Sequence, residues 1–467
     1  MDNLDNVCQS ASARGPGFRQ PAKSSKEVSG NGSVNRRALR RAQRERVRAV
    51  EWRPLQRGAA RRAPNLLVVG ASGHVAQACL LRLQLRRADF GRLVLLDPSE
   101  RVRTDPYLDH ARLDYRFVRH RLNFPLDTPY YHGLLARHRI DLVLDVTDMD
   151  TMPILAATDA AGVSYLNTSL NDARRGVAEI LSVLHPTREE QRRAPHIISS
   201  GMNPGVVNIW VWHGYQRYGV PLEIVHFEYD SSTPVTGWRP MVSWSRQEFL
   251  AESIWEPTGL VVNGKVKMLP GNSLQHREEL RPLMEPVVPL PAYPRALVVL
   301  HEENVKLGGK LATSSKYLYA IHPQTLNYLD QLWRERGRVA IDDLELGDNT
   351  SVPLAGSDTI GLCLEYPESR VYYVHTLANS DVRGTNATCA QVAVGVEAAL
   401  STLLSEPLSP RLYFSSDLYD TLYRDVVFKL LRVEHFVFAR RKRGKGARRR
   451  PAAGPQALSE APEAVVI

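Results

Sequence analysis

Residues 65–76 constrain the fold most, because an apolar run there ends at a glycine and is followed by small residues. This pattern predicts a buried strand, a tight turn and a helix that continues over Gln77–Leu85. We expect Gly70 to allow the turn, Gly73 to let the backbone approach a phosphate, and Ala76 to let the helix pack closely on the strand. The N-terminus of such a helix can receive a pyrophosphate. The spacing Gly-x-x-Gly-x-x-Ala differs from the usual dinucleotide-binding spacing Gly-x-Gly-x-x-Gly, so the interpretation needs support from the next strand.

That support comes from a second apolar run, residues 93–96, which ends in Asp97. A carboxylate at the end of the second strand can accept hydrogen bonds from an adenosine ribose, and it would repel a 2′-phosphate. The residue therefore favours NAD as the cofactor, although Arg101 and Arg103 leave the choice between NAD and NADP open. The alternative is a buried strand, turn and helix without a ligand, in which Asp97 is merely solvated.

Further strands and helices alternate along the chain beyond this motif. Strands are predicted over Arg139–Val146, Gly162–Asn167 and Pro195–Ser199, and a helix is predicted over Pro153–Ala161. Such alternation is typical of a doubly wound parallel sheet of the Rossmann type, in which ligands bind at the carboxyl ends of the strands. The positions expected to contact the cofactor are Gly70, Ser72, Gly73, His74, Val75, Asp97, Ser99, Thr147, Thr168 and Asn203.

The pattern changes after Gly205. Leu222–Tyr229 and Arg295–Leu300 are typical of antiparallel strands, Asn263–Gly264 indicates a tight turn, and Ala387–Leu404 has apolar residues at helical spacing. We therefore expect a second α+β domain with a largely antiparallel sheet, which binds substrate and forms the oligomer contact. The expected organisation is a disordered basic tail (1–63), a Rossmann domain (64–205 plus 386–437), the second domain (206–385) and a second disordered basic tail (438–467).

Positive charge is concentrated in the two tails. The chain has a net charge of +10, but residues 1–63 contribute +10 and residues 440–467 contribute +6, so the remainder has a net charge of −6. A mildly acidic body suits a cationic substrate better than a nucleic acid. For the tails, solvated segments are the favoured interpretation, and contact with nucleic acid is the less favoured alternative.

The spacing of the cysteines and the hydropathy of the chain indicate where in the cell the protein is located. Cys8, Cys79, Cys363 and Cys389 lie far apart and have neither metal-binding nor redox spacing. No apolar run reaches the roughly 18 residues of a membrane span, and the N-terminus lacks the apolar segment of a signal peptide. We therefore expect a cytoplasmic protein without a membrane anchor or a metal site.

Seven separated motifs occur in the order found in one known family. They are Leu95–Ser99, Ser200–Val207, Ser243–Ser245 with Phe249 and Glu252, Leu300–Asn304, Tyr319–Pro323, Gly356–Asp358 and Asn386–Val392. On these motifs the chain resembles bacterial homospermidine synthase, within the saccharopine dehydrogenase-like group. The resemblance implies a bound NAD that takes a hydride from a diamine such as putrescine. Ammonia then leaves, a second diamine adds, and the new imine is reduced to a triamine. We also expect a homodimer.

The residue types suit this chemistry, because a dication needs anionic partners. Trp244 can hold a cation on its ring face, while Glu252, Asp148 and Glu228 can bind ammonium groups. For Trp244 the alternative is a core residue, and for each carboxylate it is a solvated surface group. In the resemblance, the catalytic positions are Trp244, Glu252, His301 and Asn203, and the substrate-binding positions are Asp148, Glu228 and Asp358. Asp172 is added as a substrate-binding candidate at a position where the chain departs from the family. For His301, a purely structural role is the alternative to proton transfer.

One departure from the family concerns the amine pocket. Where the family has Glu-Pro-Trp, this chain has residues 171–173, Asn-Asp-Ala, and the family's strand aspartate is Asn167 here. Asp172 could substitute for the missing carboxylate, so the exact amine is the open question.

Two other functions remain as alternatives. A saccharopine- or carboxyspermidine-type NAD(P)-dependent dehydrogenase would need an arginine for the substrate carboxylate, for which Arg239 and Arg246 are the candidates. A non-catalytic NAD-binding regulator would not need a dication pocket.

Overall fold

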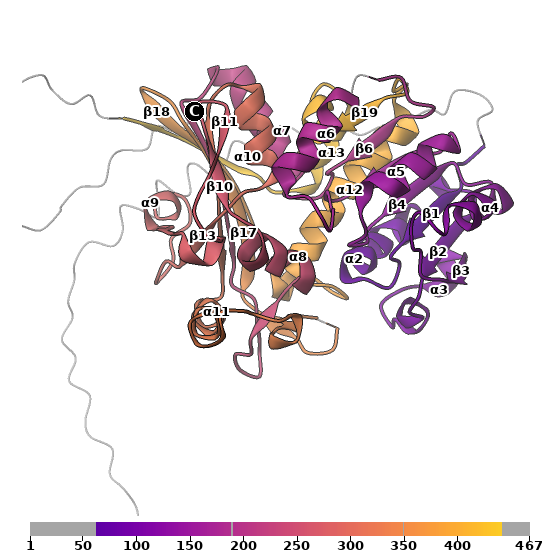
Figure 1. The fold of residues 1–467 in the computed structure, drawn as a ribbon, viewed down its shortest axis with the longest axis horizontal. Helices are drawn as coiled ribbons and strands as arrows, with labels where there is room; N and C mark the ends of the chain where they lie inside the picture. The colour runs from indigo at the N-terminus through magenta and orange to yellow at the C-terminus, as the bar shows by residue number, and fades with distance from the viewer. Residues whose placement is uncertain (1–61, 188–189, 349, 441–467) are drawn as a thin grey trace, which may run out of the picture. The chain divides into compact units, whose positions relative to one another are not determined.

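The computed structural model describes residues 62–187, 190–348 and 350–440. The two predicted basic tails lie almost wholly outside these ranges. Figure 1 shows two sheets with helices packed around them, and it gives the labels used below.

The first sheet has seven parallel strands in the order β19-β6-β5-β4-β1-β2-β3. This arrangement confirms the predicted doubly wound sheet, and the direction in which strands are added reverses between β1 and β4. The strands are β1 (Leu66–Val69), β2 (Leu93–Asp97), β3 (Tyr115–Arg119), β4 (Leu142–Asp145), β5 (Ser164–Asn167), β6 (His196–Ile198) and β19 (Leu412–Phe414).

Helices cover both faces of this sheet because successive residues of each strand point to opposite faces. Along β1, Leu66 and Val68 enter one hydrophobic core, whereas Leu67 and Val69 enter another. The helices of this region are α2 (His74–Leu83), α3 (His110–Leu113), α4 (Thr128–His138), α5 (Thr151–Ala160), α6 (Val177–Thr187) and α7 (Val206–Tyr218), with the 3₁₀ turns Gln84–Asp89 and Arg101–Thr104.

The second sheet is largely antiparallel, as predicted, with one parallel pairing. Strand β7 (Glu223–Asp230) pairs antiparallel with β17 (Ser357–Glu365) but parallel with β14 (Ser314–Ile321). The parallel pairing is possible because a long connection with several helices joins β7 to β14. The other strands are β10 (Gly259–Val262), β11 (Lys265–Met268), β12 (Arg277–Glu279), β13 (Arg295–Val299), β18 (Ser369–Ala378) and β20 (Glu434–Ala439).

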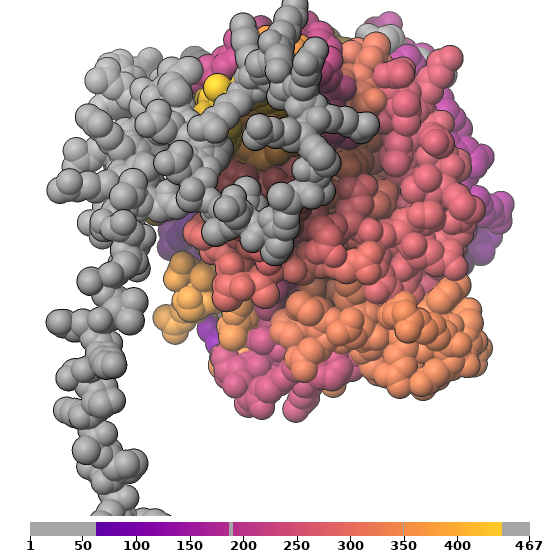
Figure 2. Space-filling view, turned by 90° about the vertical axis from the view of Figure 1, so that its left-hand side faces the viewer, coloured from indigo at the N-terminus to yellow at the C-terminus, as the bar shows by residue number. Residues whose placement is uncertain are grey.

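Short elements complete this part of the molecule. Figure 2 shows the side on which the second sheet lies, coloured pink to orange. The helices are α8 (Arg246–Leu250), the π-helical segment η3 (Ala251–Trp255), α9 (Arg281–Met284), α10 (Glu302–Lys310) and α11 (Pro323–Arg336), with 3₁₀ turns at Ser273–Gln275, Ile341–Asp343, Asn379–Asp381 and Ser415–Asp417. Two small strand pairs join β8 (Thr233–Pro234) to β16 (Leu354–Ala355) and β9 (Met241–Val242) to β15 (Glu345–Leu346).

The C-terminal part of the chain returns to the first sheet. Helix α12 (Ala387–Ser405) packs against α2 and α13 (Leu422–Leu430), β19 pairs with β6, and β20 then pairs with β18 of the second sheet. Helix α12 is long and apolar enough to cross a membrane by composition, but 72% of its most apolar window is buried inside the protein. Its apolar residues are therefore accounted for by core packing.

Candidate functional site

The first part of the site is the glycine turn, residues 70–74, between β1 and α2. Gly70 has a φ of +82°, and a Cβ there would lie 2.7 Å from Thr147 Cγ2. Gly73 donates its N–H to the Gly70 carbonyl at 3.0 Å and begins α2 without a side-chain cap. The first backbone N–H groups of α2 therefore lie at the carboxyl end of the sheet, where a phosphate can approach them.

Asp97 holds this turn in place. Its carboxylate accepts hydrogen bonds from the backbone N–H of Ser72 at 3.0 Å and of Ser99 at 2.7 Å. The Ser72 hydroxyl donates to the Ser99 carbonyl at 2.7 Å. The structure thus brings three of the expected cofactor positions together. A carboxylate has acceptor capacity beyond two hydrogen bonds, so Asp97 can still meet a ribose hydroxyl.

The other expected cofactor positions have different partners. His74 lies 3.6 Å from the Asp348 carboxylate, which belongs to the segment after β15 and also approaches Arg101 at 3.8 Å. The Thr147 hydroxyl donates to Asp145 at 2.7 Å. Val75 packs on the core, and Thr168 lies just beyond the end of β5.

Asn203 lies on the other side of the site, against the second sheet. Its amide nitrogen donates to the Glu228 carboxylate and to the Tyr317 hydroxyl, the latter at 2.6 Å. Tyr317 also donates to Glu228 at 2.5 Å. Burial raises the pKa of Glu228 to about 7, although these two hydrogen bonds oppose the shift. Asn203 therefore joins the loop after β6 to a buried carboxyl on β7.

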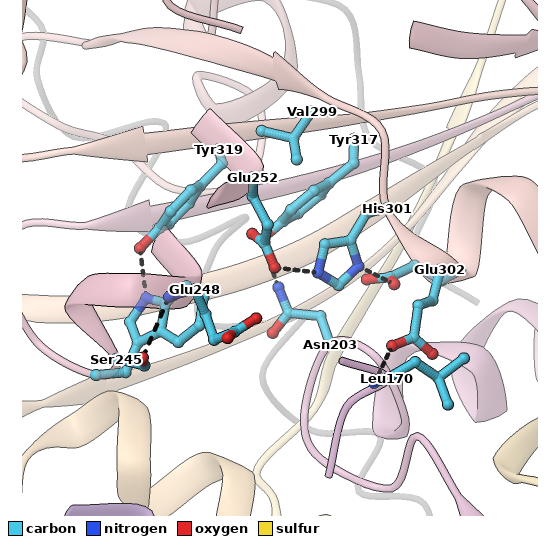
Figure 3. Close-up of polar contacts among 12 residues, drawn as sticks. Leu170, Asn203, Ser245, Glu248, Glu252, Val299, His301, Glu302, Tyr317 and Tyr319 are labelled. Atoms are coloured by element: carbon cyan, nitrogen blue, oxygen red, sulfur yellow. Dashed lines mark hydrogen bonds and ion pairs between the residues drawn. The ribbon is translucent and has the colours of Figure 1, made fainter. Parts of the chain in front are cut away.

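His301 lies between two carboxylates, as Figure 3 shows. Its Nδ1 contacts Glu303, its Nε2 is 3.4 Å from Glu252, and its ring is 4.9 Å from that of Tyr317. Burial lowers the pKa of His301, but the charges of Glu303 and Glu252 outweigh burial and raise it well above its usual value. The ring is thus held as an imidazolium.

Trp244 is oriented by a hydrogen bond. Its indole N–H donates to the Tyr319 hydroxyl at 3.0 Å, and Tyr319 stacks on Tyr317 with an interplanar angle of 8°. The next residue, Ser245, caps α8 and donates its hydroxyl to Asp148 at 3.1 Å. Asp148 follows β4, so this contact links the first sheet to the segment that holds Trp244.

Asp358 on β17 is fully buried. One oxygen accepts a hydrogen bond from Gln391 at 3.0 Å, and the other has no hydrogen-bond partner among the described residues. Burial raises the pKa of Asp358 well above its usual value, and the neighbouring Glu228 and Asp230 add to the shift.

Asp172 has a different environment from the other candidates. Its carboxylate accepts the backbone N–H of Arg174 at 2.9 Å and forms an ion pair with Arg175 at 3.0 Å. Within the described ranges, no hydrogen bond or ion pair links Asp172 to Glu252 or Glu228.

The other candidate carboxylates form one group with two glutamates that were not candidates, Glu248 and Glu303. We call Asp148, Glu228, Glu248, Glu252, Glu303 and Asp358, together with His301, the carboxylate cluster. Within the described part of the chain, His301 is the one basic side chain ion-paired with these carboxylates. The cluster therefore carries an excess of acidic groups, partly protonated in their buried positions, which a cationic ligand would offset.

The sequence interpretation missed several of these residues. Glu302 and Glu303 directly follow His301 in the quoted motif, and Glu302 accepts hydrogen bonds from Ser199 and, at 2.7 Å, from the Leu170 N–H. Glu248 lies one helical turn before Glu252, a spacing that could have identified it. Tyr317 and Tyr319 share one face of a strand by their two-residue spacing.

The parallel sheet with the glycine turn at its carboxyl end, joined to a second sheet, defines a Rossmann-type fold. No protein-family model and no curated protein sequence matches the chain. Among solved structures, homospermidine synthase from Legionella pneumophila in complex with NAD is similar at a TM-score of 0.66 and 14% identity, over 84% of this chain and 95% of that chain.

A second similar structure is apo saccharopine dehydrogenase (L-Glu forming) from Saccharomyces cerevisiae. Its TM-score is 0.50 at 12% identity, over 80% of this chain and all of that chain. At such identities the similarities show a shared fold.

Proposed function

We propose that the protein is an NAD-dependent enzyme that joins two diamines, such as putrescine, into a triamine and releases ammonia, as a homospermidine synthase does. The observation that carries this proposal is the carboxylate cluster, in which Glu228 accepts a hydrogen bond from Asn203, beside an indole that Tyr319 orients. A pocket with many carboxylates and an oriented indole is suited to a ligand with more than one positive charge.

The glycine turn supports NAD as the cofactor. Gly70 adopts the positive φ of the tight turn and Gly73 begins α2, where a pyrophosphate would bind, and Asp97 stands where the adenosine ribose would lie. A bound NAD supplies hydride transfer, first from the amine-bearing carbon and then back to the new imine. The solved homospermidine synthase with NAD has the same fold, which agrees with this assignment.

The chain's own residues would bind and orient the amine. Trp244 offers its ring face to the cationic carbon–nitrogen group, and Glu252 pairs with an ammonium. Glu228, whose pKa of about 7 lies near neutrality, can take a proton from the amine before the hydride leaves. His301 holds a proton beside Glu252 and can give it to the departing ammonia.

The two candidate arginines have other partners, which supports a diamine over a substrate with an α-carboxylate. Arg239 is exposed and lies 3.4 Å from Glu345. Arg246 donates to the Leu344 carbonyl at 3.1 Å. A saccharopine- or carboxyspermidine-type activity therefore lacks its carboxylate clamp at these positions. A homodimer and a cytoplasmic location stay predictions from the sequence.

The test is to incubate purified protein with putrescine and NAD⁺ at a concentration far below that of the amine, and to identify products by mass spectrometry. We expect triamine and ammonia to accumulate in molar excess over NAD. A product that forms only as NAD(P)H is consumed in equal amount would support the dehydrogenase alternative instead. NAD binding without any turnover of amines would support the regulator.

A further inference from the structure

Glu248 belongs to the carboxylate cluster but has no role in the proposed reaction. It lies in the first turn of α8, and its backbone N–H donates to the capping Ser245 hydroxyl at 3.2 Å. The cap fixes the start of the helix, so the side chain projects from a defined position. Figure 3 shows its carboxylate turned toward the space between Glu252 and Asn203.

The surroundings of Glu248 are acidic. Burial, together with the charges of Asp148, Glu252 and Glu256, raises the pKa of Glu248 to about 8. Burial and the charge of Glu252 also raise the pKa of Glu256. In the chain as described, none of Glu248, Glu256 and Asp148 forms an ion pair with a basic side chain, and the hydroxyl of Ser245 is the polar side-chain partner of Asp148.

Asp172 cannot take over this role in the observed geometry, because Arg175 already neutralises its charge. The segment that follows Asp172 nevertheless borders the same group of acids: a Cβ at Gly176 would lie 3.7 Å from a Glu256 carboxylate oxygen. The acidic groups without a basic partner at this end of the site are therefore Glu248 on α8 and Glu256 just after η3, rather than Asp172.

A separate observation indicates a polar ligand in this site. At the other end of the cluster, Asp358 Oδ1 and Glu303 Oε1 are fully buried and have no hydrogen-bond partner among the described residues. Buried polar atoms in folded proteins are normally paired, and an ammonium donates up to three hydrogen bonds. Both oxygens belong to the carboxylate cluster, since Glu303 contacts His301 and Asp358 lies near Glu228.

We propose that Glu248 binds the far ammonium of the substrate and so selects amines with two charged ends over monoamines. The proposal rests on the proposed function, because it assigns a substrate-recognition role within the same site. Glu252 and Trp244 hold the nitrogen that reacts, and Glu248 holds the nitrogen that does not. A monoamine has no second ammonium, so it does not contact Glu248 and lacks the binding free energy of that contact.

The experiment measures amine binding by calorimetry on the full chain saturated with NADH, which cannot accept a hydride and so prevents turnover, with putrescine and butylamine as the two probes. We expect the wild type to bind putrescine at least about tenfold more tightly than butylamine. In Glu248→Gln the putrescine affinity should fall about tenfold or more while butylamine binding stays within about twofold. Glu279→Gln, which removes an exposed carboxylate on β12, is the matched control and should change neither affinity.

The outcomes separate the two proposals. A wild type that binds neither amine would overturn the proposed function and the role of Glu248 with it. If the wild type prefers putrescine and Glu248→Gln keeps the whole preference, only the role of Glu248 is wrong. Equal loss of both amines in a folded Glu248→Gln would also overturn it, because the residue would then not act on the far nitrogen.

A second variant covers the case in which Glu248→Gln does not fold. Glu248→Asp keeps the charge but withdraws the carboxylate by one carbon–carbon bond. The preference should therefore move from putrescine toward the five-carbon diamine cadaverine. An unchanged ratio of the two diamine affinities, at an unchanged Tm, would overturn the assignment.

Discussion

The glycine turn and the carboxylate cluster face the same site but are built in different ways. In the turn, the groups that would meet a ligand are backbone atoms of consecutive residues, fixed by Gly70, Gly73 and the hydrogen bonds to Asp97. In the cluster, side chains converge from β7, α8, η3, α10 and β17. The comparison shows that a binding site made of backbone atoms is determined by a short stretch of sequence. A site made of charged side chains depends on how elements distant in the sequence pack together.

The strongest test of this difference is to change the cluster and leave the turn intact. Trp244→Ala removes the ring face, and Glu252→Gln removes a charge partner from a poorly solvated ammonium, which costs on the order of 3–5 kcal/mol. We expect amine turnover to fall by roughly 100-fold or more in each variant, with Trp244→Phe between wild type and Trp244→Ala.

NAD affinity, measured by fluorescence titration, should stay unchanged in all three variants because, among the described residues, no hydrogen bond or ion pair joins Trp244 or Glu252 to residues 70–74. Normal amine kinetics in both Trp244→Ala and Glu252→Gln would contradict the assignment of the pocket. A loss of NAD binding would show that the two regions are not separable.

The reverse experiment changes the turn. A Cβ at Gly73 would lie 3.3 Å from the Gly70 carbonyl oxygen, so Gly73→Val places a branched side chain where the phosphates approach. Asp97→Ala leaves the N–H groups of Ser72 and Ser99 without their acceptor, which costs about 1–3 kcal/mol and loosens the turn. We expect NAD affinity to fall about tenfold or more in both variants.

Binding of putrescine to the cluster gives the matched readout for these two variants. In the absence of NAD it should be unchanged, since the carboxylates are not touched. Wild-type NAD affinity in both folded variants would remove the dinucleotide assignment from the turn.

The same contrast explains how much of the molecule could be predicted from the sequence. The strand–turn–helix around Gly70, the strands β2, β4, β5 and β6 and the helix α5 follow from local patterns, and the structure confirms them. Strand β3 and helices α3, α4 and α6 were not predicted. The parallel pairing of β7 with β14 was missed, because the alternation in β7 fixes which side chains are buried but not the direction of its neighbour.

The candidate site follows a similar division. Trp244, Glu252, His301, Asn203 and Glu228 came from the resemblance, and the structure brings them together. Nothing local in the sequence shows that Glu303 contacts His301 or that Arg175 neutralises Asp172, since both depend on side-chain geometry. The roles assigned to the five candidate residues stay predictions until the variants are measured.

Glu302 connects the two regions, and it provides the test with the smallest expected effect. Its carboxyl, on α10 of the second sheet region, accepts hydrogen bonds from Leu170 and Ser199, which follow strands of the first sheet. Burial raises the pKa of Glu302 from 4.5 to about 7, although the hydrogen bond from Ser199 opposes the shift. The folded protein therefore holds this proton more tightly than the unfolded chain does.

The consequence for stability has a definite sign. Because the pKa is higher in the folded state, the stabilising contribution of the proton is complete below about pH 4.5 and is lost as the pH rises through about 7. Glu302→Gln keeps an acceptor oxygen for the Leu170 N–H, places an amide N–H group against the Ser199 hydroxyl, which can accept a hydrogen bond from it, and removes the charge. We expect the variant to unfold at about the same urea concentration as wild type at pH 5, and to be more stable by about 1–2 kcal/mol at pH 8. Equal stability of the two proteins at both pH values would mean that Glu302 does not carry an unfavourable buried charge between the two regions, and that their contact is independent of pH.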